Sequence, residues 1–263
     1  MAFIGLLGRV AIAGVLSSLL VSGCQAPARA TAARATPVAA LQATIVSLTF
    51  DDADADNFQA ATDLRQNGLP ATFYVPSGLV GSAAHMTWEQ LLTLQADGHE
   101  IGGHTLHHVN IGDMDATSRR QEVCADRQNL LDHGFKPVSF AYPFGGYDQA
   151  AKQIVRECGY ADARTIGAGP EHTPIPDLYA LRAFPYIVSD TEFGKLQRYV
   201  AATRKEGGGW VILTFHHVCD GCDYFAVRPD VLAKFVHWLA EQQSLGRLQV
   251  KTVGAVVLGN ASP

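Results

Sequence analysis

Short runs of apolar and β-branched residues alternate along the chain with longer amphipathic stretches, starting near residue 43. The short runs have the length and composition of buried strands, and we expect strands at residues 45–50, 71–75, 99–104, 138–142, 160–165, 182–188, 210–216 and 248–253. Helices are expected at residues 58–66, 87–98, 116–133, 149–157, 191–206 and 229–243. This alternation predicts parallel strands joined by crossover helices, which means a doubly wound sheet or a (β/α) barrel.

The ends of the expected helices carry recognisable signals. Thr87 followed by Gln90 has the spacing of a capping box. Gly68 and Gly98 stand where two helices should stop, and Pro229 stands in the first turn of the last helix. The amphipathic stretches are therefore expected to be separate helices with defined ends.

Polar residues cluster where several of the expected strands end. Asp51 and Asp52 follow the first strand, and His104 closes the third. Tyr142 closes the fourth strand and His216 the seventh. In a (β/α) barrel these ends share the C-terminal rim, where the active sites of that fold lie. Residues far apart in the sequence are therefore expected to meet there.

Two histidines near these strand ends are of a type that binds divalent metals. His104 and His108 are four residues apart and would share one face of a helical turn, whereas His107 is less well placed. With one aspartate they make a three-ligand set that suits zinc or a similar ion and leaves a coordination position for water. The alternative is that these histidines are ordinary surface or core residues.

The adjacent carboxylates of Asp51 and Asp52 repel each other at the end of a buried strand, unless a cation or a proton-transfer role holds them there. We expect one of them to bind the metal and the other to act on water. Asp54 and Asp56 keep open the alternative of an ordinary Asp-rich turn. His216 titrates near neutral pH and is a candidate to protonate a leaving group, the alternative being a core histidine that caps the strand.

Residues 1–23 have the features of an export signal. One charge, Arg9, precedes an apolar run at residues 10–21 that is too short to span a membrane. The run leads into Val-Ser-Gly-Cys ending at Cys24, which resembles a bacterial lipobox and implies a lipid anchor facing the extracytoplasmic side. Ordinary cleavage near residues 28–30 is the alternative and would give a secreted protein.

The remaining chain divides into a tether and one domain. Residues 24–42 are rich in Ala, Thr and Pro and are expected to be flexible, and residues 43–258 are expected to form one catalytic domain. The full chain has 263 residues, 48% of them hydrophobic, enough for one sizeable core. With 20 Lys and Arg against 25 Asp and Glu, the chain has no excess of positive charge to neutralise phosphates, so nucleic acid is excluded as a partner. We expect a monomer.

Four cysteines remain after Cys24, an even number that suits disulfides in an oxidising compartment. Cys219 and Cys222 could close a short loop, with Cys124 and Cys158 as the second pair. The alternative for Cys219 and Cys222 is a redox-active or zinc-binding site.

Four of these clusters, taken in order, resemble the successive motifs of a known family. They read Thr-Phe-Asp-Asp at 49–52, His-Thr-Leu-His-His at 104–108, Phe-Ala-Tyr-Pro-Phe-Gly at 140–145 and Leu-Thr-Phe-His at 213–216. The family is the polysaccharide deacetylases, also called carbohydrate esterase family 4 or the NodB-homology domain. The resemblance implies a distorted (β/α) barrel with about seven parallel strands. Its implied activity is metal-dependent hydrolysis of N-acetyl groups on amino sugars.

The resemblance assigns roles by position. Asp51 would be the general base and His216 the general acid. The metal ligands would be Asp52, His104 and His108, with zinc expected and cobalt or nickel as alternatives.

The loop in the third motif is expected to contact the substrate through Tyr142, Pro143 and Phe144, and the backbone N–H of Phe144 would help to hold the oxyanion. Many family members have Arg where Ala141 stands, and that Arg braces the general base. Arg164 is the candidate replacement.

Arg182 is a second candidate for this brace, and a solvated arginine is the alternative for both. The Asp-x-x-Asp-Trp motif of the family is not recognisable near residues 160–165.

The expected partner is an N-acetylated glycan outside the cytoplasm. Peptidoglycan, chitin oligomers, poly-N-acetylglucosamine and acetylated xylan are all compatible with the sequence. An O-acetyl esterase on the same fold and a non-catalytic glycan-binding lipoprotein are alternative functions. Candidate aromatic platforms for sugar rings, each equally open to a packing role, are Trp88, Tyr147, Tyr186 and Tyr224.

Overall fold

The computed structural model describes residues 44–167, 169–172, 174–205 and 209–259. All of them belong to one compact unit, Leu41–Pro263. The expected export signal at 1–23, the lipobox cysteine and the tether at 24–42 lie outside the described residues. Within the described part of the chain, no helix combines the length and the apolar character that crossing a membrane requires.

The centre of the fold is a seven-stranded parallel sheet. Its strands are β1 (Thr44–Phe50), β2 (Thr72–Val75), β3 (Glu100–Gly103), β4 (Ser139–Ala141), β5 (Asp162–Arg164), β6 (Trp210–Phe215) and β9 (Leu248–Val250). Their order is β5-β4-β3-β2-β1-β6, and β9 pairs with the first half of β1. These strands occupy seven of the eight predicted positions, so the expected α/β architecture is confirmed.

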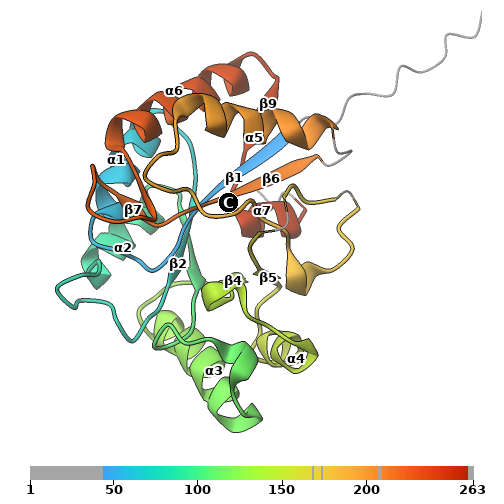
Figure 1. The fold of residues 1–263 in the computed structure, drawn as a ribbon. Coiled ribbons are helices and arrows are strands. Elements are labelled where there is room, and N and C mark those ends of the chain that lie inside the picture. Colours follow the sequence, from blue (N-terminus) through green and yellow to red (C-terminus); the bar gives the residue numbers. More distant parts are fainter. Residues whose placement is uncertain (1–43, 168, 173, 206–208, 260–263) are drawn as a thin grey trace, which may run out of the picture. The chain divides into compact units, whose positions relative to one another are not determined.

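Helices join successive strands, as predicted. They are α1 (Asn57–Gln66), α2 (Trp88–Ala96), α3 (Ala116–Asp132), α4 (Gln149–Glu157), α5 (Phe193–Lys205) and α6 (Pro229–Ser244). A further short helix, α7 (Val253–Val257), follows the last strand and was not predicted. The capping box of α2 is confirmed, because the Thr87 hydroxyl accepts from the Gln90 N–H and the Gln90 side chain accepts from the Thr87 N–H. Helices α5 and α6 pack together near β1, and α3 packs on α4 at the other edge of the sheet (Figure 1).

Shorter elements lie in the connections. They are the 3-10 turns η1 (Ile111–Asp113), η2 (Pro143–Gly145) and η3 (Leu178–Ala180), and the short strands β7 (His217–Val218) and β8 (Ala226–Val227). The last two pair only with each other in the described chain, in a separate two-stranded sheet.

The prediction of a strand at residues 182–188 is wrong. The N–H of Leu181 donates to a carbonyl of β5 (2.8 Å), and the N–H of Phe184 donates to a carbonyl of β6 (3.0 Å). Pro185 follows and has no N–H to donate, so a continuous ladder cannot form there. The segment therefore links the two edge strands by isolated hydrogen bonds, and the curled sheet becomes a distorted barrel.

Stacked aromatic rings lie where the central strands end. The ring of Phe50 at the end of β1 stacks on Phe73 of β2 (4.9 Å) and on Phe215 at the end of β6 (5.3 Å). All three side chains are fully buried. Because Asp51 and His216 directly follow two of these residues, the core fixes where both polar residues leave the strands.

Both predicted disulfides are present in the structure. Cys124 in α3 is joined to Cys158 at the end of α4, and Cys219 is joined to Cys222 just after β7.

Candidate functional site

The carboxyl ends of the central strands surround a pocket of about 270 Å³. Its lining residues are Asp51, Asp52, His104, His108, Tyr142, Phe144, Ile166, Tyr186, His216 and Phe225. The candidate base, acid and metal ligands are therefore brought together in one cavity, although they come from segments far apart in the sequence.

Asp52, His104 and His108 bring three ligand atoms together. Oδ1 of Asp52 lies 3.2 Å from Nε2 of His104 and 3.0 Å from Nε2 of His108. Asp52 and His108 both have positive φ, 71° and 55°, a left-handed conformation that costs energy outside glycine. Such strained positions concentrate at functional sites.

The hydrogen bonding of His104 shows that a positive charge must lie between its ring and Asp52. Its Nδ1 lies 2.8 Å from the carbonyl oxygen of Ala141, and because a carbonyl only accepts, Nδ1 carries the proton. In the neutral ring Nε2 then turns a lone pair toward Oδ1 of Asp52, a buried atom without a well-formed hydrogen bond to any described residue. Two facing lone pairs need a cation or an added proton between them, so these residues fit a divalent metal.

The charges in this group keep the Asp52 carboxylate ionised. Burial alone would raise the pKa of Asp52, but the His104 and His108 rings outweigh it and hold that pKa far below its ordinary value. Burial would lower the pKa of His108, but Asp52 raises it. Asp52 is therefore ionised at neutral pH, as a metal ligand must be.

Asp51 is held by a buried arginine. Nη2 of Arg164 lies 2.6 Å from both carboxylate oxygens of Asp51, and the Arg164 side chain is fully buried. Burial would lower the pKa of Arg164, but Asp51 raises it. Arg164 is also the register partner of Ala141 in the pairing of β4 with β5, so the guanidinium reaches Asp51 from the neighbouring strand. The other candidate, Arg182, contacts His172.

His216 faces both aspartates from the end of β6. Its Nε2 lies 4.0 Å from Oδ2 of Asp51 and 3.9 Å from Oδ2 of Asp52. Burial lowers the pKa of His216, although the two aspartates oppose this. Its ring packs edge-on against Tyr186 (5.0 Å) and also contacts Phe225.

The loop after β4 forms another side of the pocket. Phe144 has φ 58°, is 62% exposed, and its ring lies 4.8 Å from that of His108. Tyr142 also lines the pocket, but its hydroxyl donates to the carbonyl of Tyr179 (3.0 Å) in the interior, and Pro143 is buried.

Comparison with known proteins points to one family. The sequence model of the polysaccharide deacetylases matches residues 39–163. A deacetylase from Streptococcus pyogenes, solved in complex with acetate, is 25% identical with a TM-score of 0.55, over 59% of this chain and 69% of that one. The chain is similar to the polysaccharide deacetylase family, whose model matches just under half of its residues. The family expected from the four motifs is therefore confirmed.

Two curated relatives match only in part. A peptidoglycan-N-acetylglucosamine deacetylase from Bacillus cereus is 25% identical over 118 residues, which are 44% of this chain and 54% of the relative. A gellan lyase from a Bacillus species is 32% identical over 128 residues, 46% of this chain and 5% of the lyase. A Mycobacterium smegmatis structure assigned to the polysaccharide deacetylases is 17% identical, has a TM-score of 0.63, and covers 83% of this chain and 90% of its own. It supports the fold.

One buried carboxyl group next to the pocket was not predicted. Asp126 of α3 accepts hydrogen bonds from the backbone N–H of His104 (3.1 Å), the N–H of Ser77 (3.0 Å) and the hydroxyl of Tyr160 (3.1 Å). Burial raises the pKa of Asp126 to about 6. A signal was present in the sequence, because Asp126 stands between Val123 and Leu130 on the apolar face of its helix.

Ile166 and Phe225 were also missed as lining residues, because no motif marks the loops that carry them. Tyr186, a candidate platform, does line the pocket.

Of the other candidate platforms, Trp88 stacks on His133, Tyr147 stacks on Tyr142, and Tyr224 is 67% exposed beside Phe225.

Proposed function

We propose that the chain is a metal-dependent hydrolase that removes N-acetyl groups from amino sugars of an extracytoplasmic polysaccharide or oligosaccharide. The observation that carries this proposal is the meeting of the Asp52, His104 and His108 ligand atoms with Asp51 and His216 in one pocket. The set joins donors for a cation to two groups able to move protons. Binding a glycan without reaction would need neither.

Asp52, His104 and His108 would hold the ion, and their oxygen and nitrogen donors suit zinc, with cobalt or nickel as alternatives. When bound, the ion supplies Lewis acidity toward the acetyl carbonyl oxygen and lowers the pKa of water. The hydrogen bond from His104 Nδ1 to Ala141 keeps the other ring nitrogen free as a ligand.

Asp51 is the proposed general base. Arg164 fixes the direction of its carboxylate, because the guanidinium contacts both oxygens. Asp51 takes a proton from the attacking water as the water oxygen bonds to the acetyl carbon. The backbone N–H of Phe144 donates to the oxygen that becomes negative, and losing one such donor typically costs about 3 to 4 kcal/mol.

His216 is the proposed general acid. Burial lowers its pKa, which makes the protonated ring a stronger acid. Its Nε2 gives a proton to the sugar nitrogen as the C–N bond breaks, and the products are acetate and a free amine.

The setting outside the cytoplasm is part of the proposal. The lipobox-like sequence at Cys24 would tether a monomer to the membrane by a lipid, or cleavage at an ordinary signal site would secrete it. A relative named as a peptidoglycan-N-acetylglucosamine deacetylase favours an amino-sugar polymer as substrate.

Acetate release from N-acetylated chitin oligomers, peptidoglycan and O-acetylated xylan tests the proposal directly. We expect release from the N-acetylated substrates, loss of activity after treatment with a strong chelator, and recovery with zinc, cobalt or nickel. Full activity in the metal-free protein would contradict the metal dependence. Acetate release from O-acetylated xylan alone would show that the substrate is an ester and not an amide.

Variants of the paired aspartates separate their roles. Asp51→Asn should lower kcat by about 10²- to 10⁴-fold and leave the metal bound, because it removes only the base. Asp52→Ala should lose the metal itself. Metal content per chain and kcat are measured together, with His107→Gln as control because His107 bonds to Glu122 outside the pocket. Loss of metal in Asp51→Asn would mean that the two roles are exchanged.

A further inference from the structure

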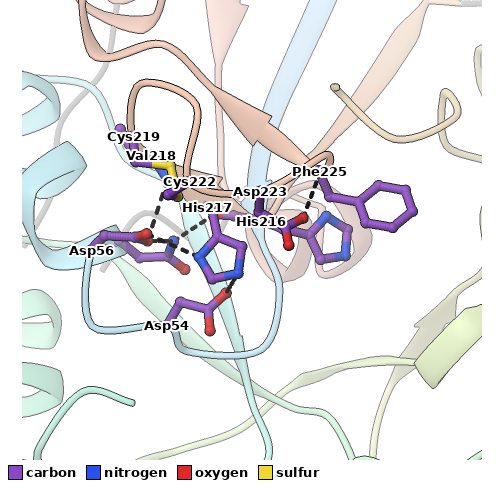
Figure 2. Close-up of a disulfide and its surroundings, with 10 residues drawn as sticks. Asp54, Asp56, His216, His217, Val218, Cys219, Cys222, Asp223 and Phe225 are labelled. Carbon is purple, nitrogen blue, oxygen red and sulfur yellow. Dashed lines mark hydrogen bonds and ion pairs between the residues drawn. A yellow bond between two sulfur atoms is a disulfide. The ribbon is translucent and has the colours of Figure 1, made fainter. Parts of the chain in front are cut away.

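A second polar cluster lies next to His216, and it joins the turn between β1 and α1 to the chain that follows β6 (Figure 2). The His217 ring stands between two carboxylates. Its Nδ1 lies 2.9 Å from Oδ2 of Asp56, and its Nε2 lies 3.4 Å from Oδ2 of Asp54. Because each carboxylate meets a different edge of the ring, the group forms an ionic clamp and not an open cation site.

The same cluster holds the main chain on both sides of His217. The side-chain amide of Asn57, a fully buried residue, donates to the carbonyl oxygen of His216 (2.5 Å) and to Oδ1 of Asp56 (3.1 Å). Oδ1 of Asp56 also accepts the N–H of Val218 (3.2 Å). The first turn of α1 therefore fixes one peptide group before His217 and one after it.

His216 lies just beyond the regular part of its strand. Strand β6 ends at Phe215, and Nδ1 of His216 is buried without a hydrogen bond to any described residue. Histidines in catalytic and metal sites usually have that second nitrogen fixed by a carboxylate or a carbonyl. Here the ring direction depends on packing against Tyr186 and Phe225 and on where the backbone places the residue.

We propose that Asp56 and Asn57, with His217 clamped between Asp54 and Asp56, are positioning residues that hold the backbone of His216 so that its Nε2 stays near Asp51 and Asp52. The catalytic part of this inference rests on the proposed role of His216 as the acid.

The charges agree with a clamp. Burial would lower the pKa of His217, but its hydrogen bond to Asp56 and the nearby carboxylates raise it, so the protonated ring can donate to Asp56 and attract Asp54 electrostatically. The disulfide between Cys219 and Cys222 follows at once and shortens the loop that leads on to Phe225 (Figure 2). Both ends of the segment around His217 are thus restrained, one by α1 and one by the disulfide.

The kinetic test compares Asn57→Ala and Asp56→Ala with the wild type in the full, zinc-loaded chain. We expect kcat on an N-acetylated oligosaccharide to fall by about 10- to 100-fold, with KM and zinc content unchanged, because a small displacement of a reacting group has effects of this size. Asp56→Asn should regain much of the lost kcat, since its amide oxygen can still accept from Val218. Asp63→Ala, further along α1, is the matched control and should behave as wild type.

A second readout does not depend on activity. In protein with ¹⁵N-labelled histidine, the ring signals of His216 should shift in Asn57→Ala while those of His104 and His108 stay in place. His217→Gln gives the same comparison if Asn57→Ala does not fold. A purely structural role would lower the melting temperature and leave both kcat and the His216 signals unchanged, which would overturn the inference. If the wild type releases no acetate from any substrate, the proposed function fails. The ring signals of His216 still show whether Asn57 holds that residue in place.

Discussion

Arg164 approaches Asp51 from β5, whereas the family pattern places an arginine in β4 where this chain has Ala141. The two residues are register partners on neighbouring parallel strands. Side chains at such positions point to the same face of a sheet, so either strand can deliver a guanidinium to nearly the same place. The small side chain of Ala141 leaves that place free for Arg164.

Arg164→Met should damage both stability and catalysis. Asp51 would be left buried without its partner, which typically costs about 3 to 5 kcal/mol, and the base would lose its fixed direction. Urea unfolding and kcat on an N-acetylated oligosaccharide measure the two effects. The double variant Arg164→Ala with Ala141→Arg should recover part of the kcat.

The control for this series is Arg182→Met, because the Arg182 side chain contacts His172. Wild-type kcat in Arg164→Met would show that Asp51 needs no brace.

The sequence pointed to the residues that end strands, because a polar residue after an apolar run is visible without coordinates. Asp51, Asp52 and His216 were found in this way. Arg164 was only one of two candidates to contact Asp51, because the register of the strands decides which side chain can reach the carboxylate. Phe225 could not be found, because its place at the pocket follows from the path of a disulfide-closed loop.

The helices and strands also differ in how well the sequence predicts them. Helix α4 has the predicted bounds, and the other predicted helices agree within a few residues, because periodicity and end signals coincide. Residues 182–188 failed because their β-branched and apolar composition outweighed the missing donor of Pro185. Helix α7 was missed because five residues, Val253–Val257, are too few to show a helical period.

The two disulfides should contribute unequally to stability. Cys124 and Cys158 are 34 residues apart and tie α3 to α4, whereas Cys219 and Cys222 are 3 apart. Loop-closure entropy in the unfolded chain then gives about 4 kcal/mol for the long loop and about 1.5 kcal/mol for the short one. Urea unfolding of the two Cys→Ala double variants measures both. Equal losses would show that restraint of the unfolded chain does not control their contribution.

For the whole molecule, the free energy of unfolding should depend on pH through His99. This side chain is 5% exposed, its Nδ1 accepts the N–H of Ala71 (3.1 Å), and burial lowers its pKa to about 4. An unfolded histidine titrates near 6.5, so between those values the unfolded chain binds a proton that the folded chain does not. Stability therefore falls as pH drops through this window, by up to about 3 kcal/mol.

His99→Asn keeps an acceptor for Ala71 and should remove this part of the pH dependence. Urea unfolding of both proteins at pH 7.5 and pH 5 gives the difference. Asp126 acts in the opposite direction, because a pKa raised to about 6 favours the folded state at low pH. The comparison must therefore be between variant and wild type, and identical pH slopes would refute the role of His99.

Outside glycine, positive φ angles among the described residues occur at Asp52, Ala53, Thr105, His108 and Phe144. At each of these residues the left-handed backbone conformation costs about 1 kcal/mol. Contacts with the neighbouring strands and helices must therefore hold the backbone in it. A short peptide with these motifs would relax into other turns and lose the cavity. Transplanting the motifs to an unrelated scaffold would fail for the same reason, unless the new host reproduced those backbone turns along with the side chains.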